Sequence, residues 1–196
     1  MLGRILASAT ALAHPAMSAS LRSQTPWRVG RRRVVAGMLA CPMLLGLAHA
    51  TPVSASTTDD ETTDDEVVSA LDLINEMRQS HGLNPLAPSG RLQSAAQLHA
   101  DDMAEHDFVS HTGSDGVDAI ERILRYYPFN SWLGETIGAG FKSGAAVVAG
   151  WERSEPHREA LMLPDFRAIG LGMAVNTRSR YRWFWTCDLG GEIDIE

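Results

Sequence analysis

A small set of histidines and acids is the part of this sequence that could do chemistry. His111 stands in the turn-rich stretch SHTGSDG, Glu135 in LGETI, and His157 at a predicted helix start, with Glu152 and Glu155 shortly before it. Imidazoles bind metal ions and transfer protons, and a carboxylate on the second ring nitrogen holds such a ring in place. These residues would form a metal or proton-transfer site if the fold brings them together, which sequence spacing does not show.

The residues around His157 predict its position in the first turn of a helix. Ser154 is of a type that caps helix N-termini, and Pro156 is tolerated only in a first turn, so a short helix should begin between them. The partial positive charge at a helix N-terminus disfavours imidazolium. We therefore expect a neutral His157 ring that can bind metal or accept a proton.

Apolar residues at helical spacing predict the elements that must position these groups. Helices are expected from Val67, around Leu92, at about 117–127 and at about 143–153. His99 points the same way as the apolar residues of the second helix. It is therefore expected to be a hydrogen-bonded helix residue and not a ligand.

The C-terminal part of the chain changes period from helix to strand. Apolar residues alternate over 169–175 and again over 181–189, which predicts a β-hairpin, whereas FNSWLGETIGAG is predicted to be a loop. Cys187 shares a strand face with two tryptophans, which indicates a buried, inert thiol. Helices first and strands last are typical of an α+β or layered αβα domain with an antiparallel sheet.

The charge distribution argues against nucleic-acid binding. The first fifty residues contain six arginines and no acid, so the rest of the chain holds 11 basic against 24 acidic residues, a formal charge near −13. Phosphate binding depends on lysine and arginine, which are scarce there. A partner is therefore expected to be a small ligand, a lipid or a peptide, and not a nucleic acid.

Residues 1–50 are predicted to be an N-terminal extension and a signal peptide. Three arginines, Arg31, Arg32 and Arg33, precede an apolar stretch at 34–48 that small residues follow. This order is compatible with a twin-arginine signal and equally with an ordinary Sec signal. The stretch is shorter than the ~20 residues of a membrane-spanning helix. We expect a secreted or periplasmic product with no stable membrane insertion after cleavage.

Composition also predicts the boundary of the folded domain. Residues 51–66 are threonine, serine and acid with almost no apolar content, which is typical of a disordered linker, so the domain should span 67–196. Of the two cysteines, Cys41 lies in the leader and leaves Cys187 alone. The mature chain should therefore contain no internal disulfide.

Four segments, in order, resemble the motifs of a bacterial single-domain member of the CAP superfamily, the SCP-like extracellular proteins. The segments are LHADDMAEHDFVSHTGSDG, LGETIGAG, VVAGWERSEPHREALMLPDFRAIGLGMA and YRWFWTCDLGG. The resemblance spans about 67–191. It implies an αβα sandwich of the α+β class, with a small three-stranded antiparallel sheet between helical layers and a central cavity.

The resemblance also implies which residues face that cavity. Carried over by motif, they are His111, Glu135 and His157, and several family members bind a divalent cation such as zinc through the two histidines. A second acid usually lies three residues after a tryptophan, where this chain has Ser154. Glu155 is a weaker choice as its substitute.

Two functions follow from these residues. The first is a secreted binding module whose cavity holds a divalent cation, zinc before others, or a small ligand. The alternative is a hydrolase that uses the histidines and Glu135 with a serine or metal-activated water, and Ser110, Ser114 and Ser154 lie near the histidines in sequence. However, the chain has no G-x-S-x-G elbow and no H-E-x-x-H helix, and Ser114 and Ser154 are explained as helix caps.

We therefore expect a binding module and not an enzyme. A third interpretation makes the same residues structural, with Glu135 anchoring its loop by accepting backbone N–H bonds.

Overall fold

The computed structural model describes residues 58–129 and 131–194, with side chains from Thr63 onward. The predicted extension and signal peptide, residues 1–50, and the start of the predicted linker lie outside the described residues. In chain order the elements are α1 (Thr58–Ser80), β1 (Ala87–Pro88), α2 (Gly90–His106), α3 (Ala119–Tyr126), β2 (Leu133–Ala139), α4 (Gly144–Arg153), α5 (Glu155–Leu161), β3 (Ala168–Val175) and β4 (Trp183–Gly190).

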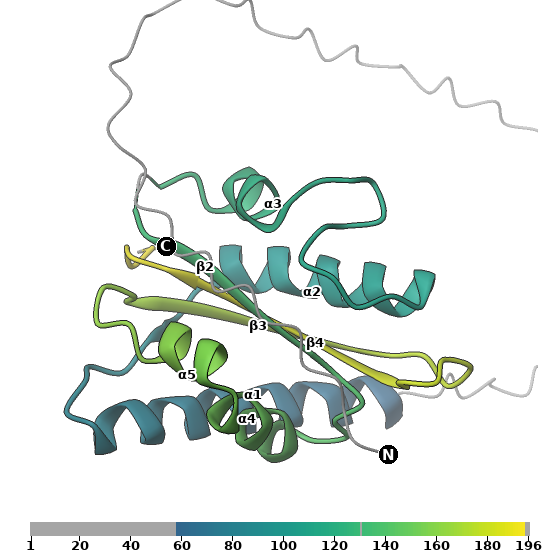
Figure 1. Ribbon diagram of the computed structural model, residues 1–196, viewed down its shortest axis with the longest axis horizontal. Helices are drawn as coiled ribbons and strands as arrows, with labels where there is room; N and C mark the ends of the chain where they lie inside the picture. Colours follow the sequence, from purple (N-terminus) through teal and green to yellow (C-terminus); the bar gives the residue numbers. More distant parts are fainter. Residues whose placement is uncertain (1–57, 130, 195–196) are drawn as a thin grey trace, which may run out of the picture. The chain divides into compact units, whose positions relative to one another are not determined.

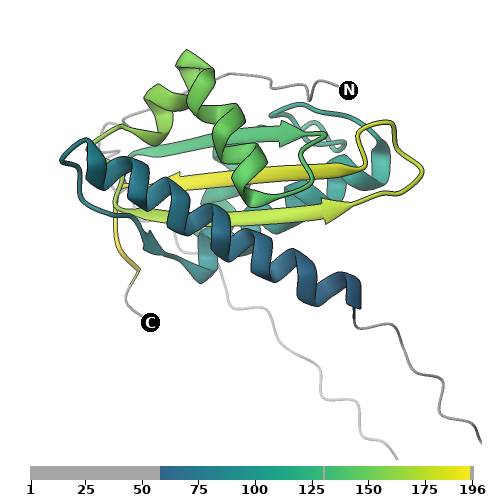
Figure 2. The ribbon, with the colours of Figure 1, turned by 90° about the horizontal axis from the view of Figure 1, so that it is seen from below.

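The strands form one sheet that lies between two layers of helices. The strand order is β1-β3-β4-β2, with β2 and β3 both antiparallel to β4 and the short β1 parallel to β3. Helices α2 and α3 lie on one side of the sheet, and α1, α4 and α5 lie on the other (Figure 1, Figure 2). Strand β2 is therefore an edge strand with helices on both sides.

Side chains at the helix N-termini fix where the helices begin. Ser89 accepts from Leu92 N at the start of α2, Asp118 from Glu121 N at the start of α3, and Ser143 from Ala146 N at the start of α4. Each contact satisfies one backbone donor that has no partner within its own helix.

Helix α2 lies directly on β3 because two glycines leave room for its backbone. A Cβ on Gly170 would lie 2.0 Å from Gln93 N, and a Cβ on Gly172 would lie 2.5 Å from Gln97 Cα. No larger residue fits at either position without moving the helix. This contact fixes the height of α2 above the sheet, and with it the side chains that α2 places there.

The opposite side of the sheet carries most of the apolar core, and a buried arginine closes one end of it. The core residues include Ile74, Trp151, Phe166 and Trp185. The Arg78 guanidinium donates to the carbonyl oxygens of Asn84 (3.0 Å), Leu161 (2.6 Å), Leu163 (3.1 Å) and Phe166 (3.3 Å). It thereby ties the end of α1 to the segment that leads from α5 into β3.

The α+β class and the layered arrangement are confirmed, and the predicted hairpin is β3 and β4. The expected three-stranded antiparallel sheet was wrong in strand count, because residues 87–88 add a short parallel strand beside β3. The predicted loop at 129–140 was wrong as well, since residues 133–139 form β2. All residues of β2 are buried, so they show no alternation of apolar and polar types.

Two helix boundaries also differ from the predictions. Helix α1 begins at Thr58, so residues 58–66, assigned by composition to a disordered linker, are helical. Glu66 contributes to the fold there, since its Oε2 accepts from Gly144 N at the start of α4 (2.8 Å). Helix α3 is shorter than predicted and is capped by Asp118, not by Ser114.

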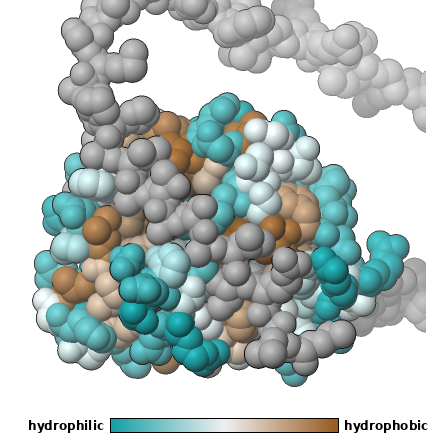
Figure 3. Space-filling view, viewed as in Figure 1, coloured by the Kyte–Doolittle hydropathy of each residue, from teal (hydrophilic) through white to brown (hydrophobic). Residues whose placement is uncertain are grey.

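The surface mixes polar and apolar side chains. On the side seen in Figure 3, small hydrophobic areas alternate with hydrophilic ones. The large hydrophobic side chains that are exposed lie far apart in the sequence: Val68, Leu98, Tyr126, Val175 and Ile193. None of the helices in residues 58–129 and 131–194 is both long enough and apolar enough to cross a bilayer.

Candidate functional site

The loop that carries His111 is held against α2 and leads into α3. The ring of His99, on α2, donates from Nε2 to the carbonyl oxygen of Ser110 (2.8 Å). Further along, Asp102 Oδ2 accepts from Ser114 N (2.8 Å). His99 is therefore a hydrogen-bonded helix residue, as predicted, and it fixes the backbone next to His111.

Burial keeps the His99 ring neutral. Desolvation lowers its pKa, and this effect outweighs the nearby Glu135 charge, which raises it. A neutral ring that donates from Nε2 carries no proton on Nδ1. His99 thus acts as a fixed hydrogen-bond donor to the loop and not as a second charge at the site.

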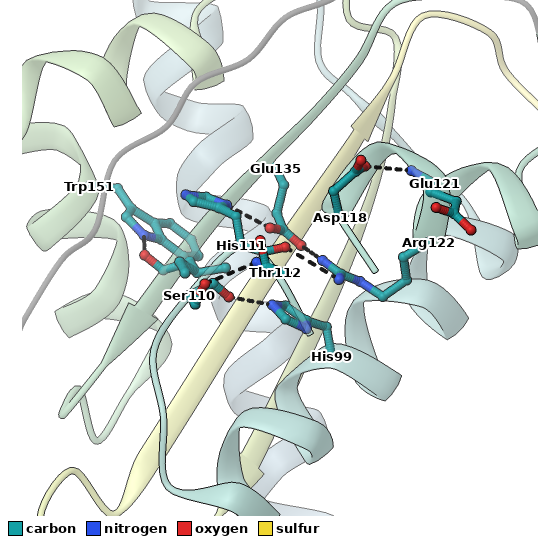
Figure 4. Close-up of polar contacts among 10 residues, drawn as sticks. His99, Ser110, His111, Thr112, Asp118, Glu121, Arg122, Glu135 and Trp151 are labelled. Atoms are coloured by element: carbon teal, nitrogen blue, oxygen red, sulfur yellow. Dashed lines mark hydrogen bonds and ion pairs between the residues drawn. The ribbon is translucent and has the colours of Figure 1, made fainter. Parts of the chain in front are cut away.

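Glu135, in β2, joins the His111 loop to α3. His111 Nδ1 donates to Glu135 Oε1 (2.6 Å), and Arg122 Nη2 donates to Glu135 Oε2 (Figure 4). Arg122 Nη1 also reaches the carbonyl oxygen of His111 (3.4 Å). Both oxygens of the Glu135 carboxylate are thus engaged by side chains, so the interpretation of Glu135 as an acceptor of backbone N–H bonds does not describe its contacts.

The charge of Glu135 is stabilised by these neighbours although the side chain is almost fully buried. Burial alone would raise the pKa of this carboxyl. The hydrogen bond from His111 and the Arg122 charge outweigh burial, and the net pKa lies below the ordinary value of 4.5. Glu135 is therefore anionic at neutral pH, and it holds His111 with its proton on Nδ1.

His157 approaches the sheet from the other helical layer. It lies buried in the first turn of α5, and its Nδ1 is hydrogen-bonded to Ser154 Oγ (2.7 Å). Ser154 occupies the N-cap position of α5, but its side chain makes no cap hydrogen bond. The explanation of this serine as a capping side chain was therefore wrong, because its hydroxyl bonds to His157 instead.

The junction of α4 and α5 is anchored on the same strand that carries Glu135. Trp151 Nε1 donates to the carbonyl oxygen of Ile137 in β2 (3.1 Å), and Trp151 is fully buried. The structure thus pairs His111 with Glu135 and His157 with Ser154, on two sides of β2. Glu152 and Glu155 are both exposed.

The side chains around the histidines in the described part of the chain do not form a closed metal site. Glu135 has both oxygens engaged, and no group of three or more His, Cys, Asp or Glu side chains in the described part of the chain is arranged to hold an ion. Each imidazole has an oxygen partner on Nδ1, as metal-binding histidines usually have. Two histidines would leave the remaining positions to water or to a ligand.

A hollow of about 320 Å³ lies between α2 and α3, beside the Arg122 that contacts Glu135. Its lining includes Leu98, His99, Asp102, Arg122 and Tyr126. Neither His111 nor His157 lines it. It adjoins the His111–Glu135 pair only through His99 and Arg122.

Two ionisable residues of this region were missed by the sequence reasoning. Arg122 carries the positive charge opposite Glu135, and Asp188 is fully buried on β4 directly opposite Glu135. A signal for Asp188 existed, because an acid interrupts a strand of apolar residues. Cys187, its neighbour on the other face, is fully buried, and burial raises the pKa of its thiol, which confirms the inert role predicted for it.

Comparison with known proteins assigns the fold to a family. The model of the cysteine-rich secretory protein family (CAP) matches residues 71–189, which include every residue of the pairs described above. The chain belongs to the CAP family. The resemblance seen in the four sequence motifs is thereby confirmed.

Relatives of this CAP domain occur in longer proteins. The "uncharacterized membrane protein YlbC" of Bacillus subtilis is 32% identical over 113 residues, which cover 58% of this chain and 32% of the relative. The "uncharacterized protein YkwD" of the same bacterium is 29% identical over 130 residues, 64% of this chain and 51% of the relative. The CAP chain thus spans about a third and about half of the lengths of these two relatives.

Solved structures show the same fold in bacterial surface proteins. An extracellular protein with an SCP domain from Bacillus anthracis superimposes with a TM-score of 0.61 at 26% identity, over 70% of this chain and 45% of that one. An outer surface protein of Borrelia burgdorferi gives a TM-score of 0.59 at 25% identity, over 67% of this chain and 96% of that one. Both relatives are described as extracellular or outer-surface proteins.

Proposed function

We propose that this CAP domain is a secreted binding module in which His111 and His157 bind a divalent cation, with zinc the best match. The observation that carries the proposal is that each ring has an oxygen partner on Nδ1: Glu135 Oε1 at 2.6 Å for His111 and Ser154 Oγ at 2.7 Å for His157. Such partners orient a coordinating imidazole so that Nε2 faces the ion. Zinc accepts imidazole ligands readily and tolerates water in its open positions.

The two partners differ in charge, which bears on affinity. A carboxylate beside His111 raises the basicity of that ring, whereas the Ser154 hydroxyl beside His157 is neutral. With two protein ligands the ion keeps open positions, so a small ligand, a lipid or a peptide with a donor atom can complete the coordination. We therefore propose a site of modest affinity that captures a ligand and does not store metal.

Zinc titration by calorimetry tests this function directly. The intact protein is compared with a His111→Ala/His157→Ala variant and with His106→Ala, which removes an exposed histidine from the end of α2. We expect saturable binding that His106→Ala keeps and the double variant loses. Binding should weaken as the pH falls below ~6.5, because protonated imidazoles cannot coordinate. Binding that survives in the double variant, or is absent from the intact protein, contradicts the proposal.

The contact between Ser154 and His157 favours a second candidate, a hydrolase. A serine hydroxyl 2.7 Å from an imidazole nitrogen is the arrangement by which a base activates a nucleophile. A fluorophosphonate probe distinguishes the two functions. Labelling that Ser154→Ala abolishes supports the hydrolase, whereas an unlabelled protein that binds zinc supports the binding module.

We also propose that the chain is exported by a signal peptide within residues 1–50. The order of arginines, apolar stretch and small residues supports export, and both the Sec and the twin-arginine route remain open. Replacement of Arg31 and Arg32 by lysine in a bacterial host with both routes separates them. Export that stops indicates the twin-arginine route, and export that continues indicates Sec.

A further inference from the structure

Asp188 is a buried acid that the proposed binding function does not use. It lies on β4 directly opposite Glu135 of β2, on the side of the sheet that faces α2 and α3. Its other strand neighbour is Gly170, over which the α2 backbone passes. The side chain is fully buried, between Glu135 on one side and the glycine on the other.

Asp188 is buried without a hydrogen-bond donor among the described residues, which favours its protonated form. No N–H or O–H group in the described part of the chain donates to either of its carboxylate oxygens. The residue directly opposite it on β2 is Glu135, whose carboxyl group is buried as well. Two carboxyl groups share a hydrogen bond only when one of them is protonated, because two buried carboxylates in contact repel each other strongly.

We propose that Asp188 is a positioning residue for His111: as a neutral carboxylic acid it donates its proton to the Glu135 carboxylate, and the pair carries a single negative charge. Glu135 accepts hydrogen bonds from His111 on the loop and from Arg122 on α3, and the proton of Asp188 on β4 would be its third donor. Held in this way, the carboxylate cannot turn away from His111. The protonated Asp188 thus orients the Glu135 carboxylate, which in turn orients the His111 ring.

The surroundings decide which of the two acids keeps the proton. Glu135 faces the His111 ring and the Arg122 guanidinium, and both favour its ionised form. Asp188 has no such donor, and its pKa is raised well above the ordinary value of 3.8 by burial first and by the Glu135 charge second, against a smaller opposing effect of Arg122. The proton therefore belongs to Asp188, and the ionised group is Glu135.

A protonated Asp188 also predicts the sign of one pH effect on stability. In the unfolded chain Asp188 ionises near 3.8, whereas in the folded protein it stays protonated to higher pH. The unfolded state therefore binds fewer protons in this window, and the contribution of Asp188 to the free energy of unfolding falls as the pH rises through it. Asp188→Asn has no such proton to lose, so it should lack this fall.

Carbon-13 NMR of the side-chain carboxyl groups tests the assignment on the intact protein without added metal, so its outcome is independent of the zinc titration. In protein labelled at aspartate, we expect one carboxyl to remain protonated at neutral pH and to disappear in Asp188→Asn. Asp101→Asn, which removes an exposed acid from α2, should remove only an ordinary resonance. In Glu135→Gln the Asp188 resonance should titrate at lower pH, because the neighbouring charge is gone.

Three results would overturn the inference. Aspartates that all titrate in the ordinary range would show that Asp188 is ionised. A protonated resonance that persists in Asp188→Asn would belong to another residue. If Asp188 titrates at the same pH in Glu135→Gln as in the wild type, its proton is retained by burial alone and is not shared with Glu135. If Asp188→Asn does not fold, infrared spectra of unlabelled and aspartate-labelled wild-type protein decide, since a protonated aspartate shows an isotope-sensitive C=O band at neutral pH.

Discussion

Helix α3 carries two arginines, each paired with a glutamate, that offer a matched test of how the site is held together. In the pair of Arg122 and Glu135 the side chains are 6% and 1% exposed. In the pair of Arg125 and Glu121, one turn further on, they are 51% and 60% exposed. The two arginines thus share a helix and differ in burial, so Arg122→Met and Arg125→Met isolate the effect of burial.

The expected magnitudes differ severalfold. Arg122→Met leaves the Glu135 carboxylate buried beside a single nitrogen partner, and loss of one member of a buried ion pair costs about 3–5 kcal/mol. Arg125→Met breaks a solvated pair that contributes at most about 1 kcal/mol. For a domain of this size each kcal/mol lowers Tm by roughly 3–5 °C. Arg122→Met should therefore lower Tm by roughly 10–25 °C, and Arg125→Met by no more than about 5 °C.

The same variant should become more sensitive to acid. The lowered pKa of Glu135 contributes stability that is present above the ordinary value of 4.5 and is lost as the pH falls through the folded value. Without the Arg122 charge the folded pKa rises, so the acid unfolding midpoint should move to higher pH. Urea and thermal unfolding followed by circular dichroism, repeated at several pH values, measure both effects.

One outcome would refute this reasoning. If Arg122→Met costs no more free energy of unfolding than Arg125→Met, the Glu135 carboxylate is not dependent on its arginine and the buried pair does not organise the site. Arg122→Lys provides a second point, because it keeps the charge and loses the planar fork. It should fall between the wild type and Arg122→Met.

Two further predictions concern the frame around the site. Arg78→Met removes the donor from four carbonyl oxygens, two of them fully buried contacts, and should cost about 3 kcal/mol in urea unfolding, whereas the exposed Arg153→Met should cost less than about 0.5 kcal/mol. Equal losses would show that the carbonyls find other donors. Gly170→Ala forces α2 away from β3, since its Cβ would meet the Gln93 backbone at 2.0 Å, and should cost about 3 kcal/mol. In Gly113→Ala the new carbon would meet the movable Asp115 carboxylate, so a Gly170→Ala loss no larger than that of Gly113→Ala would contradict the close contact.

Much of the fold was predictable because most of its helices carry apolar residues at helical spacing on one face. The helices α2, α4 and α5 and the β3–β4 hairpin follow from periodicity and caps. Strand β2 could not be predicted in this way, because helices cover both of its faces. Its residues are all buried and therefore show no alternation of polar and apolar types. The prediction for the acidic start of α1 was also wrong, because its composition of threonine and acid is typical of disordered segments although the residues are helical.

The site was predictable only in part. His111, Glu135 and His157 stood out as titratable residues among turn formers and at a helix start, and the family resemblance ordered them. Arg122 did not stand out, because an arginine on a short helix is usually solvated. Its burial depends on β2 and α3 lying side by side, which is a tertiary contact that no local pattern encodes.

The contact between Trp151 and Ile137 has a consequence for how this domain behaves at high concentration. An outer strand of a sheet offers backbone groups to any incoming strand, and long unprotected edges promote aggregation. Strand β2 is such an outer strand, and its Ile137 carbonyl oxygen already accepts from the indole of Trp151. The tryptophan therefore occupies a position at which a second chain would otherwise pair, so the domain gains protection against strand-to-strand association at β2.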